Sequence, residues 1–450
     1  MNNKMKHPST PVDAAAPTVL MADVAQRSGN VATFADPDKP MKRFWVHGWK
    51  QPGDWLEWVV ESPSAQRVEV SVLTKGATAI SLTWPSGKLQ AELPPNDYQR
   101  TMIGSLLLPA GRSTLRAVLT SLPGKELEFR SVELMPEAAK SDFQKRAASL
   151  RSDTRWLRDA KYGAMFQWGS WGYPEHGPAK PWPRMIDDFD VGTFARMVDE
   201  EFGAGYVLWS ITWRGSKFSA PLKSVERIVP GQTCSRDLIG DLAKALNKRG
   251  IKLMLYYHPG HEDRKWWTAN WVSNDEKTKF FAQWCEVVPE IGTRYGDQLA
   301  GWFFDDGMVY YPAPFERLAK AAKAGYPQRL LSFNEWILPL TTEFQDVQFG
   351  EGFRGDSKTP IGGDGIYASG PMKGQQSHGM IMVDGPDWGI WQPETVITTM
   401  LSPGEALQIV RPMMERGQVL TLNLNMYEDG SISPQSRKVM ETVRKEIRHR

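Results

Sequence analysis

Two adjacent carboxylates, Asp305 and Asp306, follow an unbroken apolar run, GWFF, at residues 301–304. A run without polar residues indicates a strand that is buried on both faces, as in a parallel sheet. Parallel α/β folds place their chemistry at the carboxyl ends of such strands, where buried acids are costly unless they have a function. A strand followed by an Asp-Gly turn would explain the same letters without any chemistry. The surrounding segments decide between the two interpretations.

Other residues that could act with this pair also follow predicted strands. Glu351 ends a short apolar segment, and Glu335 follows the strand before it. His258 follows a third strand, so a hydrogen bond from its ring to a substrate hydroxyl is its expected role. His258 and His261 also have the spacing of a metal-binding pair, but the Pro-Gly between them breaks the helix that such spacing needs. We therefore favour the substrate contact over a metal.

The elements that would position these residues begin near residue 161, where apolar runs alternate with helical periodicity. We predict strands at residues 162–168, 204–211, 252–258, 299–305, 329–334, 347–351, 380–383 and 419–423. We predict helices at residues 191–202, 236–249, 278–295, 314–324, 392–400 and 434–449. Eight strands with intervening helices over residues 161–450 fit a (β/α)8-type barrel. A doubly wound open sheet is the alternative, but no glycine fingerprint for a dinucleotide or phosphate follows any predicted strand.

Short runs of alternating polarity, separated by turn signals, precede the barrel at residues 41–137. Their spacing predicts a small N-terminal β-sandwich. In pattern it resembles the carbohydrate-binding modules of bacterial glycosidases, although a sandwich that only packs against the next domain would look the same. Residues 138–160 are predicted to be a helical linker. Residues 1–40 are rich in Ala, Pro, Ser, Thr and Asp, which predicts a disordered leader.

Composition narrows the possible partners. Lys plus Arg number 54 and Asp plus Glu 52, so the net charge of +2 gives no case for nucleic acid or an anionic membrane. No apolar run approaches the roughly 18 residues that a spanning helix needs, so membrane insertion is not expected. Two cysteines exclude a disulfide framework and a cysteine-based zinc site. The 19 tryptophans favour a carbohydrate ligand weakly, because indole faces stack on sugars but also fill ordinary cores.

The compartment and the oligomeric state stay open at this point. The first forty residues lack the apolar block of a signal peptide. A periplasmic or secreted location is favoured if such a peptide has been removed, and a cytoplasmic one otherwise.

Five segments, in chain order, resemble the retaining α-L-fucosidases of glycoside hydrolase family 29. They are KYGAMFQWG at 161–169, FGAGYVL at 202–208, RDLIG at 236–240 with RGIKLMLYY at 249–257, RYG at 294–296 leading to WFFD at 302–305, and LTLN at 420–423 with DGSI at 429–432. Each match alone is weak, but the ordered set spans the whole predicted barrel. The resemblance implies an exo-acting retaining hydrolase that removes a terminal sugar from an oligo- or polysaccharide.

The resemblance also assigns the two carboxylates of such an enzyme. The family's nucleophile aligns with Asp305. Asp306 occupies the position where the family usually has glycine, so shifting the alignment by one residue would make Asp306 the nucleophile, and it is kept as the alternative. Glu351 is similar in position to the family's acid/base glutamate, and Glu335 is its rival. Retaining chemistry needs two carboxylates about 5 Å apart and water, so no cofactor is expected.

The sugar-binding positions depart from the family. It contacts sugar hydroxyls with the histidine of H-W-G and a histidine pair in H-H-D-G-F, where this chain has Gln167 and the segment TWRG at 212–215. A pocket built for one pattern of hydroxyls rejects others, so we expect another sugar, or fucose bound in another way. Arg214 could meet an acidic sugar or a sulfate. The predicted substrate-binding residues are Gln167, Trp168, Trp213, Tyr257, His258 and Trp388, the last in a segment that resembles the family's S-W-G-Y.

The lost histidines leave a second function open. A non-catalytic carbohydrate-binding protein on a degenerate fucosidase scaffold would show the same segments. A carbohydrate-active lyase is a more distant possibility, because no motif fixes a Tyr, His or Lys base.

Overall fold

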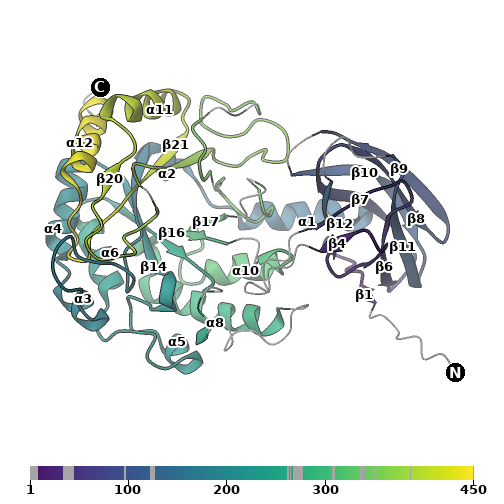
Figure 1. Cartoon of the computed structure of the whole chain (residues 1–450), viewed down its shortest axis with the longest axis horizontal. Helices are drawn as coiled ribbons and strands as arrows, with labels where there is room; N and C mark the ends of the chain where they lie inside the picture. Colours follow the sequence, from purple (N-terminus) through teal and green to yellow (C-terminus); the bar gives the residue numbers. More distant parts are fainter. Residues whose placement is uncertain are drawn as a thin grey trace. The chain divides into compact units, whose positions relative to one another are not determined.

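The computed structural model describes residues 9–33, 45–95, 98–121, 127–260, 263, 265–266, 277–306, 310–334, 338, 340–348, 350–355, 357, 359–385 and 387–448. The chain divides into two compact units, Met1–Ser149 and Leu150–Arg450. Figure 1 draws the first in purple to blue and the second in blue to yellow. No helix in the described ranges is long and apolar enough to cross a membrane.

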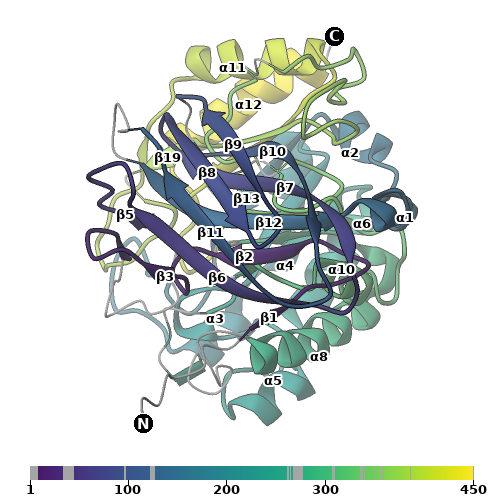
Figure 2. The ribbon, with the colours of Figure 1, turned by 90° about the vertical axis from the view of Figure 1, so that its right-hand side faces the viewer.

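The first unit is a β-sandwich, and Figure 2 shows its strands in purple and blue. One sheet contains β1 (Thr10–Pro11), β3 (Gln26–Arg27), β6 (Trp55–Ser62), β8 (Thr78–Trp84), β9 (Gly87–Leu93) and β11 (Gly111–Leu119). The other contains β2 (Thr18–Met21), β4 (Ala32–Thr33), β5 (Val46–His47), β7 (Gln66–Lys75), β10 (Gln99–Leu108) and β12 (Glu128–Pro136). Alternate residues of β7, namely Val68, Val70 and Val72, are fully buried, as expected of strands with one face on a core.

The predicted disordered leader is wrong for residues 9–33, which contribute strands to both sheets. β2 pairs antiparallel with β12, and its Leu20 is buried in the sandwich core. The indole of Trp58 donates a hydrogen bond of 2.8 Å to the carbonyl of Met21. The sequence does not reveal this strand, because only four residues, TVLM, have the apolar character of a strand and they lie in a segment rich in Ala, Pro, Ser, Thr and Asp. Residues 1–8 and 34–40 lie outside the described residues.

The predicted helical linker consists of two helices that belong to different units. Helix α1 (Glu137–Leu150) follows β12 without a break, and Lys140 on it donates to Glu69 of β7 at 2.8 Å. Helix α2 (Arg155–Ala160) lies in the second unit and leads directly into its first strand.

The second unit is built on a parallel sheet of seven strands. They are β13 (Tyr162–Phe166), β14 (Tyr206–Thr212), β15 (Lys252–Tyr257), β16 (Leu299–Phe304), β17 (Leu330–Phe333), β18 (His378–Met382) and β21 (Val419–Leu424). Their order is β17-β16-β15-β14-β13-β21-β18. This sheet confirms the (β/α)8-type fold, because it runs around most of a barrel.

The predicted eighth strand, at residues 347–351, forms isolated bridges instead of a regular strand. At its start, the backbone N–H of Asp346 donates to the carbonyl of Leu331 on β17 at 2.8 Å. At its end, Glu351 forms a parallel bridge with Met380 on β18. The segment therefore lies between the two edge strands of the sheet and closes the ring.

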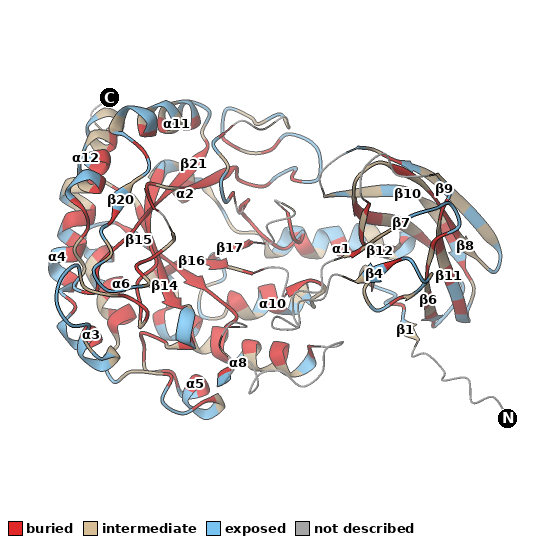
Figure 3. Cartoon of the chain, in the orientation of Figure 1, coloured by how far each residue is buried: buried red, intermediate tan, exposed pale blue. Residues whose placement is uncertain are grey.

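Helices cover the outer face of the barrel, and Figure 3 shows their inner sides buried and their outer sides exposed. They are α3 (Trp182–Asp188), α4 (Val191–Arg196) with the π-helical η1 (Met197–Phe202), α5 (Lys223–Ile228), α6 (Leu238–Lys248), α8 (Thr278–Tyr295) with η3 (Gly296–Gln298), α10 (Phe315–Ala322), α11 (Pro403–Glu415) and α12 (Pro434–Arg448). Strand residues alternate between this helix layer and the barrel interior. On β16, for example, the indole of Trp302 donates to the carbonyl of Ala322 in α10 at 3.0 Å.

The helix predicted at residues 392–400 is wrong. Its end forms β20 (Thr398–Thr399), which pairs antiparallel with β19 (Asp384–Gly385). Only Ile397 of its three large aliphatic side chains is buried, while Val396 and Met400 are exposed, so the segment has no helical apolar face. The helix begins instead after Ser402, whose side chain forms a capping box with Glu405 of α11.

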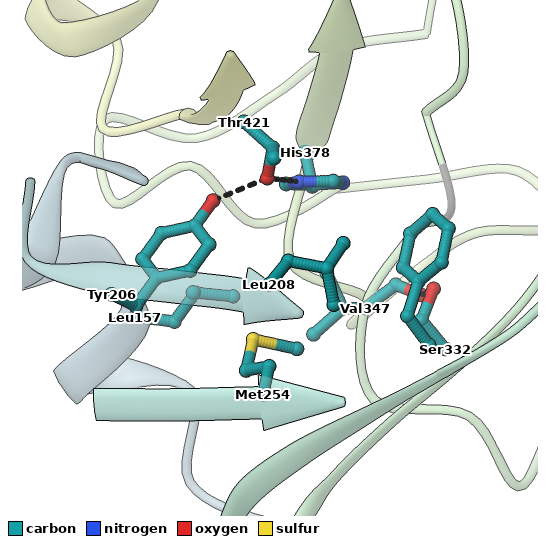
Figure 4. A pocket seen from close by; sticks show the side chains of 9 residues that line it. Leu157, Tyr206, Leu208, Met254, Ser332, Val347, His378 and Thr421 are labelled. Atoms are coloured by element: carbon teal, nitrogen blue, oxygen red, sulfur yellow. Dashed lines mark hydrogen bonds between the residues drawn. The ribbon is translucent and has the colours of Figure 1, made fainter. Parts of the chain in front are cut away.

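Three buried polar side chains form a small cluster inside the barrel, near the amino-terminal ends of the strands. Figure 4 shows the hydroxyl of Thr421 between the phenol of Tyr206 and the ring of His378, at 2.6 and 2.7 Å. Met254 and Phe303 line the narrow cavity beside these residues. These side chains fill the barrel interior near the amino-terminal ends of the strands. The pocket described below lies at the carboxyl ends.

Candidate active site

A pocket with about 150 Å³ of space accessible to water lies at the carboxyl ends of the barrel strands. Its walls come from most of the ring, because β13 to β18 and the bridged segment at Glu351 contribute residues on or just after them. The lining residues are Met165, Gln167, Trp213, Tyr256, His258, Phe303, Asp305, Asp306, Asn334, Glu351, Met380 and Trp388. A mainly apolar cavity with a few converging polar groups is the usual form of a small-molecule site.

The sheet holds Asp305 at the centre of this pocket. Its backbone N–H donates to the carbonyl of Tyr257 at 3.0 Å, so the hydrogen-bond ladder between β15 and β16 continues one residue past the strands. The phenol of Tyr256 donates to Asp305 Oδ2. The amide of Asn334 donates to Asp305 Oδ1 at 2.6 Å. Two side-chain donors on separate strands therefore fix the orientation of this carboxylate.

Asn334 links Asp305 to Glu351. Its backbone N–H donates to the carbonyl of Phe304 at 2.8 Å, which fixes the residue at the end of β17. The same Nδ2 atom that binds Asp305 also donates to Glu351 Oε2 at 2.9 Å. Two oxygens at 2.6 and 2.9 Å from one nitrogen are at most 5.5 Å apart. This upper limit on the distance between the two bonded oxygens is compatible with the roughly 5–5.5 Å between the carboxyl groups of retaining glycosidases.

Burial and mutual repulsion set the protonation of the two acids. Burial, followed by the charge of Asp305, raises the pKa of Glu351 to about 7. Burial and the neighbouring Asp306 also raise the pKa of Asp305, while His258 and the hydrogen bond from Tyr256 oppose this rise. Because Asp305 accepts two side-chain hydrogen bonds and Glu351 accepts one from Asn334, a single shared charge is better stabilised on Asp305. At neutral pH the pair can therefore hold one proton, on Glu351.

Asp306 faces a different partner from Asp305. Its backbone has a φ of 60°, a left-handed conformation that Asp tolerates better than most residues. Asp306 is 2% exposed, and its Oδ2 lies 3.2 Å from Nε2 of His258. Nδ1 of His258 accepts a hydrogen bond of 3.0 Å from the N–H of Gly260. The neutral ring therefore carries its proton on Nε2 and donates it to Asp306.

Gln167 presents an unused acceptor in the pocket. The side chain is hydrogen-bonded to the phenol of Tyr256, and this bond lowers the pKa of that phenol, as a donated N–H does. Oε1 of Gln167 is buried and has no hydrogen-bond partner among the residues that the structure describes. An unpaired buried acceptor is costly in a folded protein unless something binds to it.

Two of the predicted contact residues point away from the pocket. Tyr257 packs in the helix layer, with its ring centroid 6.1 Å from that of Phe218. The indole of Trp168 donates to the carbonyl of Glu428 at 3.2 Å and packs against Phe189. Both assignments miss by one residue, which on a strand is the opposite face. Glu335 and His261 lie outside the described residues.

The sequence analysis missed five residues that line the pocket, namely Met165, Tyr256, Phe303, Asn334 and Met380. The alternation of side chains could have found four of them. Met165 and Tyr256 are two residues before Gln167 and His258, and Phe303 is two before Asp305, so each pair shares a face. Asn334 is two residues beyond Ser332, whose side chain also lines the barrel interior.

The second unit is thus a (β/α)8-type domain with paired carboxylates at the carboxyl ends of its strands. The chain matches the family model described as alpha-L-fucosidase over residues 187–445, more than half of its length. It belongs to the α-L-fucosidase family, which implies a carbohydrate substrate. No curated protein matches the sequence.

Several solved structures are similar to this chain. The endo-fucoidan hydrolase MfFcnA4 of glycoside hydrolase family 107 is 14% identical, with a TM-score of 0.50, over 68% of this chain and 54% of that one. The endo-fucoidan hydrolase MfFcnA9 of the same family is 14% identical, with a TM-score of 0.50, over 65% and 64%. The α-L-fucosidase AlfC from Lactobacillus casei is 15% identical, with a TM-score of 0.47, over 66% and 99%. At these identities, the two likenesses with a TM-score of 0.50 show the fold alone.

Proposed function

We propose that this protein is an exo-acting retaining glycoside hydrolase of the α-L-fucosidase type. The observation that carries the proposal is the placement of Asp305 and Glu351 on one amide group, at most 5.5 Å apart. Inverting enzymes hold their carboxyl groups about 6.5–9.5 Å apart to leave room for a water molecule. The shorter separation supports a direct attack by one carboxylate on the sugar.

In this mechanism Asp305 is the nucleophile and Glu351 the acid/base. Asp305 attacks the anomeric carbon while the protonated Glu351 gives its proton to the leaving oxygen, which forms a covalent glycosyl-enzyme. Glu351, now ionised, then takes a proton from water as the water attacks the anomeric carbon and releases Asp305. Tyr256 and Asn334 hold the nucleophile in position for both steps.

The environment of Glu351 supports its part. A general acid works best when its pKa lies near the working pH, and burial beside Asp305 brings the pKa of Glu351 to about 7. Asp306 is a weaker candidate for the nucleophile because it is turned toward His258. We infer that Asp306 instead holds the ring of His258, whose two nitrogens bond to Gly260 and Asp306, as part of the pocket wall beside the nucleophile.

The residues around the two acids support a sugar ligand. They differ from the histidines with which the family usually binds its sugar. Trp213 and Trp388 line the pocket and offer faces on which a sugar ring can stack. Gln167 offers an acceptor for one hydroxyl. We propose that these three residues select the terminal sugar, which is either fucose bound differently or another sugar.

A panel of aryl glycosides and fucosylated oligosaccharides tests the proposal. Proton NMR of the released sugar should show retained anomeric configuration at early times. Asp305→Gly should lower turnover by roughly 10³-fold or more without unfolding the protein. Asp297→Ala, which removes an exposed carboxylate, is the matched control and should keep full turnover. Wild-type activity in Asp305→Gly, or an inverted product, would overturn the mechanism.

The same panel tests the alternative function, a carbohydrate-binding protein without catalytic activity. The absence of the family's sugar-binding histidines allows this alternative. Such a protein would bind one of the sugars and release none. Retention of a buried, paired acid with a pKa of about 7 supports catalysis, since binding alone does not need a proton donor of that kind.

A further inference from the structure

The guanidinium of Arg214 lies at the edge of the pocket on an aromatic platform. It stacks over the ring of Trp391 at 3.9 Å and lies 5.8 Å from the ring of Trp213. Trp391 and Trp213 meet edge to face, with centroids 4.9 Å apart. Because Trp213 lines the pocket, the platform continues directly from the pocket wall.

The backbone under Arg214 is held in place. Arg214 begins the 3-10 turn η2 (Arg214–Ser216), in which the N–H of Ser216 donates to the carbonyl of Trp213 at 2.9 Å. Gly215 has a φ of 72°, a conformation that glycine adopts without strain. Trp171 packs on Trp213 at 5.8 Å from the other side. The backbone from which the Arg214 side chain extends is therefore fixed by local contacts.

Among the described residues, the charge of Arg214 is not neutralised by a neighbouring carboxylate. The side chain is exposed, and within the described part of the chain no carboxylate forms an ion pair with it. Stacking occupies the face of a guanidinium and leaves its N–H edge open. That edge matches the two oxygens of a carboxylate or sulfate in a bidentate contact.

We infer that Arg214, Trp391 and Trp213 form a subsite for an anionic sugar unit, one that carries a sulfate ester or a carboxylate. The inference rests on the proposed function, which determines which sugar unit of the substrate would meet Arg214. An exo-acting pocket encloses the sugar that is removed, so a group at its edge meets the next unit, on the leaving side. The pocket itself contains the carboxylates of Asp305 and Asp306, which repel an anion, so the anionic group belongs outside it, at Arg214.

A binding experiment tests the subsite without relying on turnover. Calorimetry with N-acetylglucosamine 6-sulfate, glucuronate and unmodified N-acetylglucosamine should show at least roughly tenfold tighter binding of an anionic sugar than of the neutral one. Arg214→Met should remove this difference. Arg214→Lys should keep part of it, because the charge remains but the planar fork is lost. Lys248→Met is the matched control, since it removes an exposed positive charge at the end of α6 and should change nothing.

The two sources of negative charge are separated by the same titrations. Tighter binding of the sulfated sugar alone assigns the subsite to sulfate esters, and tighter binding of glucuronate alone assigns it to carboxylates. Equal binding of the charged and neutral sugars would overturn the inference. So would a preference for anions that survives in Arg214→Met.

Turnover extends the test to the complete site. With fucosyl-N-acetylglucosamine and its 6-sulfate as substrates, the ratio of kcat/KM for the sulfated over the neutral compound should fall at least about tenfold in Arg214→Met. The wild-type ratio should also fall as salt is raised, because an exposed ion pair is screened. If no glycoside is cleaved, the proposed function fails, while the calorimetry still decides whether the anionic subsite exists.

Discussion

Asp305 and Glu351, which are 46 positions apart in the sequence by subtraction of their numbers, accept hydrogen bonds from the same nitrogen atom. That nitrogen is Nδ2 of Asn334, at 2.6 Å from Asp305 and 2.9 Å from Glu351. The amide limits the distance between the two acids and also couples their charges, since the charge of Asp305 is one cause of the raised pKa of Glu351. Geometry and protonation in this site therefore depend on one side chain.

Replacing Asn334 with Ala should affect both properties. We expect kcat to fall by about 10- to 100-fold, because the two acids lose their common support. The hydrogen bond from Asn334 lowers the pKa of Glu351, so its loss should move the alkaline limb of the pH–rate profile to higher pH. A profile of kcat/KM against pH measures the shift. An unchanged alkaline limb with full kcat would show that the amide does not couple the acids.

Tyr256→Phe removes the phenol that donates to Asp305. The hydrogen bond from Tyr256 lowers the pKa of Asp305, so without it the acidic limb of the pH–rate profile should move to higher pH. We expect kcat/KM at the optimum to fall by about tenfold. Tyr257→Phe is the matched control, because that side chain points into the helix layer and should leave the acidic limb in place. Equal shifts in both variants would contradict this assignment.

Glu351→Gln should change how stability depends on pH. The folded-state pKa of Glu351, about 7, lies above its usual value of 4.5, so the folded protein binds the proton more tightly than the unfolded chain does. The wild type therefore loses the stability that comes from this proton as pH rises from about 4.5 to about 7. The glutamine variant has no such proton, so its stability does not fall for this reason. Relative to wild type, the variant should gain on the order of 2 kcal/mol between pH 5 and pH 8.

Thermal melts at both pH values measure this difference. Glu343→Gln, at an exposed position, is the control and should show no such gain. A constant difference between Glu351→Gln and wild type at both pH values would exclude a raised pKa for Glu351.

Gln167→Ala tests whether the unpaired oxygen of Gln167 binds substrate. Loss of one buried substrate hydrogen bond should lower kcat/KM by at least roughly tenfold, about 1.4 kcal/mol. Melting temperature and steady-state kinetics must be measured on the same preparation. A lower melting temperature with unchanged kinetics of the folded fraction would give Gln167 a structural role only.

The repeating pattern of the barrel made much of the fold predictable. Seven predicted strands appear in the sheet, because a run such as LAGWFF is apolar on both faces and leaves no other place for its side chains. The 347–351 segment is only bridged, and Gly350 within it has a φ of 75°, which no periodicity reveals. The short strand β2 was hidden for a different reason, since its few apolar residues lie in a stretch of leader-like composition.

The site was predictable only in part. Seven predicted residues line the pocket. Six of them were expected there because they lie at the ends of predicted strands or just after them, and the seventh, Trp388, because its segment resembles the family's S-W-G-Y; the six are Gln167, Trp213, His258, Asp305, Asp306 and Glu351. Alternation along β17 could have placed Asn334 in the pocket, but its bonds to two residues on other elements are encoded by no local pattern. Tyr256 and Tyr257 are adjacent tyrosines, and alternation from His258 assigns Tyr256 to the barrel interior, as the structure shows.

The central claim is that Asp305, and not Asp306, forms a covalent bond to the sugar. Incubation with a 2-deoxy-2-fluoro glycosyl fluoride of the preferred sugar should trap the intermediate, and mass spectrometry of the digested protein can locate it. The account predicts one sugar on Asp305 in the wild type and in Asp306→Asn, and none in Asp305→Asn. A label on Asp306, or turnover with an inverted product and no label, would contradict it.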